Sequence, residues 1–183
     1  MLGVFWLKGF ASTSLQDLSE ATGLKQGSLY AAFNSKEEMF QRSISRYLVW
    51  LGQELTTPAK GLDGIRAVLS TVARLTIDDT QRRGCPLINA IAESEALSDG
   101  LREELAAGLK AMLRRMRRYV VEADRMKHAP SEVDDLAALL LAASVSLRVL
   151  GKAKAPAPLL RQVVEGACLS AAAWANGPRK PAS

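Results

Sequence analysis

The side chains best suited to recognising a partner lie between Thr13 and Phe40, and they are of the kinds that contact nucleic acid. The segment from Lys25 to Tyr30 carries ammonium, amide, hydroxyl and phenol groups around Gly27, which has no side chain to hold a partner away. Such groups bind phosphate oxygens and base edges in the grooves of DNA. The residues whose types fit DNA contact are Thr13, Ser14, Lys25, Gln26, Gly27, Ser28, Tyr30 and Lys36.

These residues divide by the part of DNA that they fit. Side chains at the start of a recognition helix reach deepest into the groove, so we expect Gln26 and Ser28 to contact base edges. Four others fit the phosphate backbone, namely Thr13, Lys25, Tyr30 and Lys36. The phenol of Tyr30 fits a base edge as well.

Capping signals at the start of this stretch predict a first short helix. Ser14 precedes an apolar run with helical spacing, and Asp17 places an acidic group in the first turn, where backbone amides lack partners. The helix is expected to end at Gly23, because glycine adopts positive φ without strain. We expect Leu24 to fill the corner that follows.

A second and a third helix follow closely. The second is predicted over 26–32, with Leu29 and Phe33 facing inward. An S-x-x-E capping box that begins at Ser35 starts the third helix and puts Lys36 beside free backbone amides, a setting that suits a phosphate. Three helix starts and two sharp turns within so short a stretch indicate a helix-turn-helix.

The segment GFASTSLQDLSEATGLKQGSLYAAFNSKEEMF resembles the DNA-binding domain of the TetR (tetracycline-repressor-like) transcriptional regulators. Its run Leu-Tyr-x-x-Phe-x-Ser-Lys-Glu is highly specific for that family. The resemblance implies an all-α homodimer whose second short helix lies in the major groove of double-stranded operator DNA. It further implies a helix-turn-helix domain in residues 1–46, followed by a helical effector-binding and dimerisation domain in 47–183.

The start of the chain departs from the family pattern. Only Leu2 to Gly9, which resembles the last turns of the family's first helix, precedes Phe10, and residues 1–40 carry three lysines against four acidic residues, a net charge of −1. Fewer neutralised phosphates would weaken DNA binding. We therefore expect the native chain to begin upstream of Met1. The alternative is a regulatory or scaffold protein whose helix-turn-helix is degenerate and no longer binds DNA.

Composition indicates an ordinary globular protein. The 183 residues are 48% hydrophobic and 23% charged, and the net charge is +5. The positive excess lies outside the helix-turn-helix, in a run that we interpret as a solvated helix face: Arg114, Arg115, Arg117 and Arg118. No signal peptide is present, and the apolar run from Leu136 to Leu147 is too short to span a membrane. We expect a cytoplasmic protein.

No catalytic or metal-binding pattern emerges. The single histidine, His128, lies at a predicted helix end beside a proline, where a solvated C-terminal cap is expected. Glu93 and Glu95 are two residues apart on a predicted helix and point to different faces. Cys85 and Cys168 lack C-x-x-C spacing and should remain thiols. We predict no enzymatic activity, no cofactor and no metal.

Apolar periodicity predicts that the rest of the chain is helical. The helices are expected over 36–55, 63–78, 87–96, 99–127, 131–151 and 159–174. The last two contain many small residues and few surface charges, so we interpret them as a dimer interface that forms a four-helix bundle with the partner subunit. The alternative is that they form the hydrophobic core of a monomer. The tail, 176–183, is expected to be disordered.

Two hypotheses concern the effector. Apolar walls with a few polar groups on converging helices are typical of ligand pockets, although the same residues could simply fill the core. The residues expected to line the pocket are Trp50, Val72, Cys85, Asn89, Met112, Met116 and Tyr119. A small apolar or electrophilic effector bound there would release the DNA.

The second hypothesis concerns Cys85 itself. The sequence places its thiol at the N-cap of a helix that starts at Pro86, close to Arg82 and Arg83, a setting that favours the thiolate. Some TetR-like regulators carry Gly-Cys at this point, and the resemblance implies a sensor of electrophiles or oxidants. The alternative is a buried packing residue, which is the role we expect for Cys168.

Overall fold

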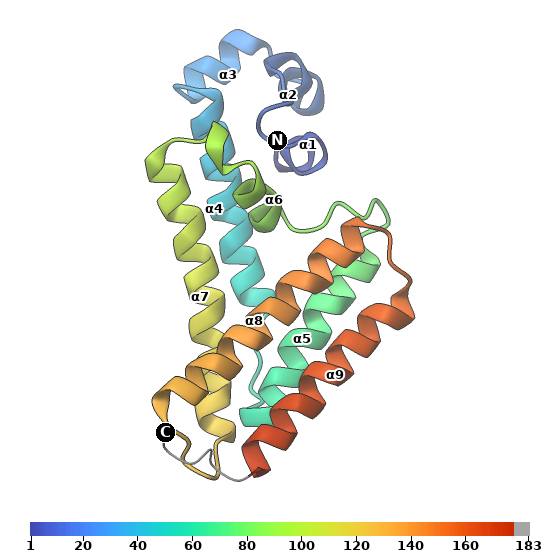
Figure 1. Ribbon diagram of the computed structural model, residues 1–183. Coiled ribbons are helices and arrows are strands. Elements are labelled where there is room, and N and C mark those ends of the chain that lie inside the picture. The colour runs from blue at the N-terminus through green and yellow to red at the C-terminus, as the bar shows by residue number, and fades with distance from the viewer. Residues whose placement is uncertain (178–183) are drawn as a thin grey trace. The chain divides into compact units, whose positions relative to one another are not determined.

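The computed structural model describes residues 1–177, and every regular element in that range is a helix. The elements, shown in Figure 1, are α1 Leu2–Lys8, α2 Leu15–Thr22, α3 Gln26–Ala32, α4 Lys36–Glu54, α5 Gly61–Asp78, α6 Pro86–Ala92, the short 3₁₀ helix η1 Ser94–Ala96, α7 Asp99–Ala123, α8 Pro130–Lys152 and α9 Ala157–Asn176. The expected all-α fold class, with a helix-turn-helix followed by a helical domain, is confirmed.

The chain forms two compact units. The first contains Met1–Gln53 and Cys85–Leu109, and the second contains Glu54–Gly84 and the described residues from Lys110 onward. The first unit therefore includes α6 and the start of α7 in addition to the helix-turn-helix. The division into domains at residues 46 and 47 stays a prediction about which parts fold independently. The expected disorder of the tail falls largely on residues 178–183, outside the described range.

The first helix of the helix-turn-helix, α2, begins and ends as predicted. Asp17 N donates to Ser14 Oγ at 3.1 Å, and Ser14 N donates to Asp17 Oδ2 at 2.9 Å, which completes a capping box. Gly23 ends the helix with φ 71°. The prediction for Leu24 is wrong, because its side chain is 46% exposed. The corner is closed by a hydrogen bond instead, from Ser19 Oγ to the carbonyl of Leu24 at 2.5 Å.

The helices α3 and α4 also start as predicted, but the cap between them differs in detail. Glu38 N donates to Ser35 Oγ at 3.0 Å, as a capping box requires. The carboxylate of Glu38, however, accepts from the backbone amide of Asn34 at 2.8 Å, one residue before the expected donor. Leu29 on α3 is fully buried as predicted, whereas Phe33, the residue that follows α3, is only partly buried.

An aromatic cluster forms the core beneath α1. The ring centroid of Phe40 on α4 lies 5.0 Å from that of Phe5 and 5.2 Å from that of Phe10. Phe5 and Phe40 are buried. These contacts attach the short first helix and the turn that follows it to α4.

In the second unit α5, α8 and α9 pack side by side (Figure 1). Their buried faces supply the core, which includes Val68, Leu69, Leu140, Leu147 and Leu160. Cys168 on α9 is buried, as predicted, and burial raises the pKa of its thiol. No helix within residues 1–177 combines the length and apolar character needed to cross a membrane.

Two helix ends differ from the prediction by more than two residues. The helix α6 stops at Ala92, and the 3₁₀ turn η1 follows it. The helix α7 stops at Ala123 instead of 127, because the Asp124 carboxylate accepts the amides of Met126 at 3.2 Å and His128 at 2.8 Å. Such side-chain bonds compete with the helix ladder.

His128 is not the solvated cap that the sequence predicted. It is buried, its Nδ1 lies 2.8 Å from Asp124 Oδ1, and its ring stacks on Trp174 of α9 with centroids 4.0 Å apart. Burial raises the pKa of Asp124, but the hydrogen bonds from His128 outweigh it and leave that pKa below its usual value. The histidine therefore fastens the end of α7 to α9.

Candidate DNA-binding and effector sites

The outer face of α3 gathers most of the residues predicted to contact DNA. Lys25, Gln26, Gly27, Ser28 and Tyr30 are all exposed, whereas Leu29 between them is buried. Ser14, at the N-cap of α2, is exposed as well. One turn and a half of helix therefore presents an ammonium, an amide, a hydroxyl and a phenol on a single surface, as groove contact requires.

The structure places Thr13 and Lys36 differently. Thr13 is only 2% exposed, and its Oγ1 donates to the carbonyl of Gly9 at 2.6 Å. The ammonium of Lys36 donates to the carbonyls of Phe10 and Thr13, each at 3.0 Å, and lies 4.6 Å from the centre of the Phe10 ring. Both residues thus hold the turn between α1 and α2. Their contact with phosphate stays a prediction.

Two of the four acidic residues within 1–40, Asp17 and Glu38, are bound by cations or amides of the protein. Lys8 Nζ lies 2.6 Å from Asp17 Oδ1 and, with the Ser14 hydrogen bonds, lowers the pKa of Asp17 to about 2. The Asn34 amide, followed by the guanidinium of Arg42, lowers the pKa of Glu38. Arg42 lies just outside residues 1–40, so the net charge of −1 omits the cation that pairs with Glu38.

Sequence reasoning missed the role of Glu93, which it considered only as a catalytic group. The Glu93 side chain, at the end of α6, accepts the amides of Phe10 at 2.9 Å and Ala11 at 3.3 Å. Gly9, with φ 81°, lets the backbone approach this carboxylate. Phe10 and Ala11 lie 83 and 82 positions from Glu93 in the sequence, so no local spacing could have revealed the contact.

The residues expected to line the effector pocket divide between the two units. Trp50, Cys85 and Asn89 belong to the first, and Met112, Met116, Tyr119 and Val72 belong to the second. Val72, Met116 and Tyr119 are buried. The phenol oxygen of Tyr119 is a buried polar atom without a hydrogen-bond partner within residues 1–177.

Cys85 caps α6, as predicted, with Pro86 at the first helical position. Its thiol is 2% exposed and lies 3.2 Å from the hydroxyl of Tyr47. The guanidinium of Arg83 is paired with Asp79 at 2.9 Å. Sensing by Cys85 stays a prediction, and burial adds the requirement that the first unit open before an electrophile can reach the sulfur.

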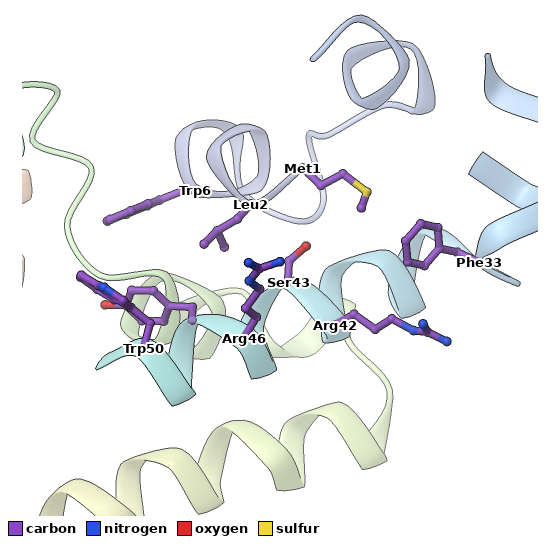
Figure 2. Close-up of a pocket in the computed structure, with 9 residues that line it drawn as sticks. Met1, Leu2, Trp6, Phe33, Arg42, Ser43, Arg46 and Trp50 are labelled. Carbon is purple, nitrogen blue, oxygen red and sulfur yellow. The ribbon is translucent and has the colours of Figure 1, made fainter. Parts of the chain in front are cut away.

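One cavity of about 720 Å³ lies in the first unit, between α1 and α4 (Figure 2). The residues that line it include aromatic side chains and two arginines but no carboxylate. Of the residues expected to bind an effector, only Trp50 contributes to this cavity.

Comparisons with known proteins agree with this architecture. Residues 2–42 match the family described as bacterial regulatory proteins, tetR family, and residues 61–163 match the family described as tetracyclin repressor-like, C-terminal domain. The HTH-type transcriptional repressor ComR of Escherichia coli (strain K12) is 49% identical over 45 residues, which are 25% of this chain and 21% of ComR.

Two further relatives cover more of the chain. YezE of Bacillus subtilis (strain 168), an uncharacterized HTH-type transcriptional regulator, is 28% identical over 94 residues, 49% of this chain and 48% of YezE. The alignments with ComR and YezE thus span about a fifth and about half of those proteins. A cysteine-substituted TetR family transcriptional regulator, CifR, in complex with 26 bp double-strand operator DNA is 32% identical, with a TM-score of 0.76, over 92% of this chain and 91% of CifR.

These matches cover the helix-turn-helix and more than half of the whole chain. They also agree with the expectation that the protein is not an enzyme, since the matched families are regulatory proteins. The chain belongs to the TetR family of bacterial transcriptional regulators.

Proposed function

We propose that this protein is a homodimeric cytoplasmic repressor that binds double-stranded operator DNA through the helix-turn-helix at 14–33 and releases it when a small apolar or electrophilic effector binds. The observation that carries the proposal is the exposed polar face of α3, whose opposite side is anchored by the buried Leu29. The operator complex of CifR and the repressor activity of ComR, named above for those proteins, support it.

Selection of bound sequences from a random pool of double-stranded DNA tests the first part. Wild-type protein should enrich one operator. Gln26→Ala should weaken binding to that operator by about 1–3 kcal/mol and relax the preference at one base position. Gln53→Ala, which changes an exposed glutamine at the other end of α4, is the matched control and should leave binding unchanged. A pool without enrichment would favour the alternative, a head that no longer binds DNA.

The salt dependence of binding tests the phosphate contacts. Lys25→Ala and Lys36→Ala should each lower the slope of log affinity against log salt by about one. The structure allows a different outcome for Lys36, because its ammonium already binds the carbonyls of Phe10 and Thr13. If Lys36→Ala lowers the free energy of unfolding but leaves the slope unchanged, Lys36 holds the turn and does not bind a phosphate.

Exposed leucines on α8 and α9 support the proposed dimer. Leu139 on α8 is 54% exposed and Leu169 on α9 is 67% exposed. Exposed apolar side chains on neighbouring helices are typical of a surface covered by a partner. Leu169→Glu should shift the sedimentation coefficient to that of a monomer. Leu7→Glu, which changes an exposed leucine on α1, should leave the dimer intact.

The buried phenol of Tyr119 supports an effector site in the second unit. A buried hydroxyl without a partner costs about 1–3 kcal/mol, which a ligand acceptor could recover. Tyr119→Phe should therefore weaken an effector found by a thermal-shift screen without lowering the stability of the free protein. Hits that do not respond to Tyr119→Phe would contradict this placement.

A further inference from the structure

The cavity between α1 and α4 has an aromatic floor. Tyr47 is buried beneath it, and its ring centroid lies 5.8 Å from that of Trp6 and 5.5 Å from that of Trp50. Both indoles contribute to the cavity lining. The volume of about 720 Å³ lies within the range of small-molecule sites. Rings arranged in this way offer a flat arene both face and edge contacts.

The two arginines of the cavity differ in how their charges are satisfied. Arg42 binds the Glu38 carboxylate, with Nη2 at 2.7 Å and Nε at 3.0 Å, and lies 5.4 Å from the Phe33 ring centre. Arg46 forms no ion pair or hydrogen bond with the described part of the chain. In Figure 2 the side chain of Arg46 extends from α4 toward Leu2 on α1, whereas that of Arg42 extends toward the end of the cavity near Phe33.

The lining contains no carboxylate that could neutralise Arg46. The side chain of Arg46 is exposed, and a guanidinium presents paired N–H groups that match the two oxygens of a carboxylate. The indole of Trp50, one helical turn along α4 from Arg46, lies on the same cavity and can contact the body of such an anion. Charge and shape together thus specify an anion with a flat apolar body.

We propose that this cavity binds a small aromatic carboxylate, with its ring against Trp50 and Trp6 and its carboxylate on Arg46. The site lies within the first unit and shares only Trp50 with the residues expected to bind the effector. The proposal concerns binding alone and does not depend on operator binding or release, so its failure would leave the proposed repressor function untouched.

Isothermal titration calorimetry with 2-naphthoate tests the proposal. Wild-type protein should bind one molecule per chain. The neutral isostere 2-naphthamide and the variant Arg46→Gln should each bind at least about tenfold more weakly, because each loses a charge-assisted pair. Trp50→Leu should weaken binding by about fivefold or more through lost aromatic contact. Octanoate, which keeps the carboxylate without a ring, should also bind more weakly.

A matched control separates a specific pair from a general effect of charge. Arg114→Gln removes one exposed guanidinium from α7, outside the cavity, and should change the affinity for 2-naphthoate by less than about twofold. Circular dichroism of each variant confirms that it is folded. Equal affinities for naphthoate and naphthamide, an unchanged affinity in Arg46→Gln, or no binding by wild-type protein would overturn the proposal.

Discussion

The contact between Gly9 and Glu93 leads to a quantitative prediction about the free energy of unfolding of the first unit. Gly9 adopts φ 81° and ψ 171°, a region that essentially only glycine occupies. A Cβ built there would lie 2.7 Å from Glu93 Oε2 and 2.8 Å from Glu93 Cδ, so the carboxylate would have to move. Moving it breaks its hydrogen bonds from the amides of Phe10 and Ala11.

The cost of Gly9→Ala therefore has two parts. The backbone strain contributes about 1–3 kcal/mol. The two amide bonds to the partly exposed carboxylate contribute about 1 kcal/mol more. We expect Gly9→Ala to lower the free energy of unfolding of the first unit by about 2–4 kcal/mol. In a Glu93→Ala background the same change should cost about 1 kcal/mol less, because no carboxylate remains to be displaced.

Urea unfolding followed by tryptophan fluorescence measures these values. In a Trp174→Phe background the remaining tryptophans, Trp6 and Trp50, both report on the first unit. Gly3→Ala, on the helix α1 that Gly9 ends, is the control, since a Cβ there meets no atom within 4 Å. It should stabilise the protein by up to about 1 kcal/mol. A Gly9→Ala variant as stable as wild type would refute the strain, and an equal cost with and without Glu93 would refute the coupling.

Three further predictions follow from other contacts. Gly64→Ala should lower the free energy of unfolding by about 1–3 kcal/mol, because its Cβ would lie 2.5 Å from Cε1 of Tyr119, and Tyr119→Leu should reduce that cost in urea unfolding. The pKa of Asp17 is lowered from 3.8 to about 2, chiefly by Lys8. The contribution of Asp17 to stability is therefore complete above pH 3.8 and is lost as the pH falls toward 2. Lys8→Gln should raise the midpoint pH of acid unfolding, and an unchanged midpoint would contradict the pairing. Iodoacetamide should label Cys85 slowly in the folded protein and faster as urea opens the first unit, since the thiol is buried; rapid labelling of the folded protein would contradict this.

The sequence alone was sufficient for the helix-turn-helix and the all-α class. The predicted starts of α2, α3 and α4 are confirmed, because the groups that start and stop these helices lie within four residues of one another. A cap such as Ser14 or Gly23 acts through its own neighbours, so its effect can be predicted from spacing. The exposed face of α3 follows from the same helical period, which places Leu29 inward.

Only the tertiary structure decided what several polar side chains do. Glu93 was considered only for catalysis and His128 was expected in solvent, but each binds groups of the protein. Lys36 also binds carbonyls of the protein, while its contact with a phosphate stays a prediction. For Lys36 and Glu93 the partners lie 23 to 83 residues away in the sequence. His128 binds Asp124 locally, but stacking on Trp174 of a different helix is what buries it. Local spacing determines how a helix begins and which face is apolar, whereas the partner of a polar side chain depends on which elements pack together, and no short stretch of sequence specifies that.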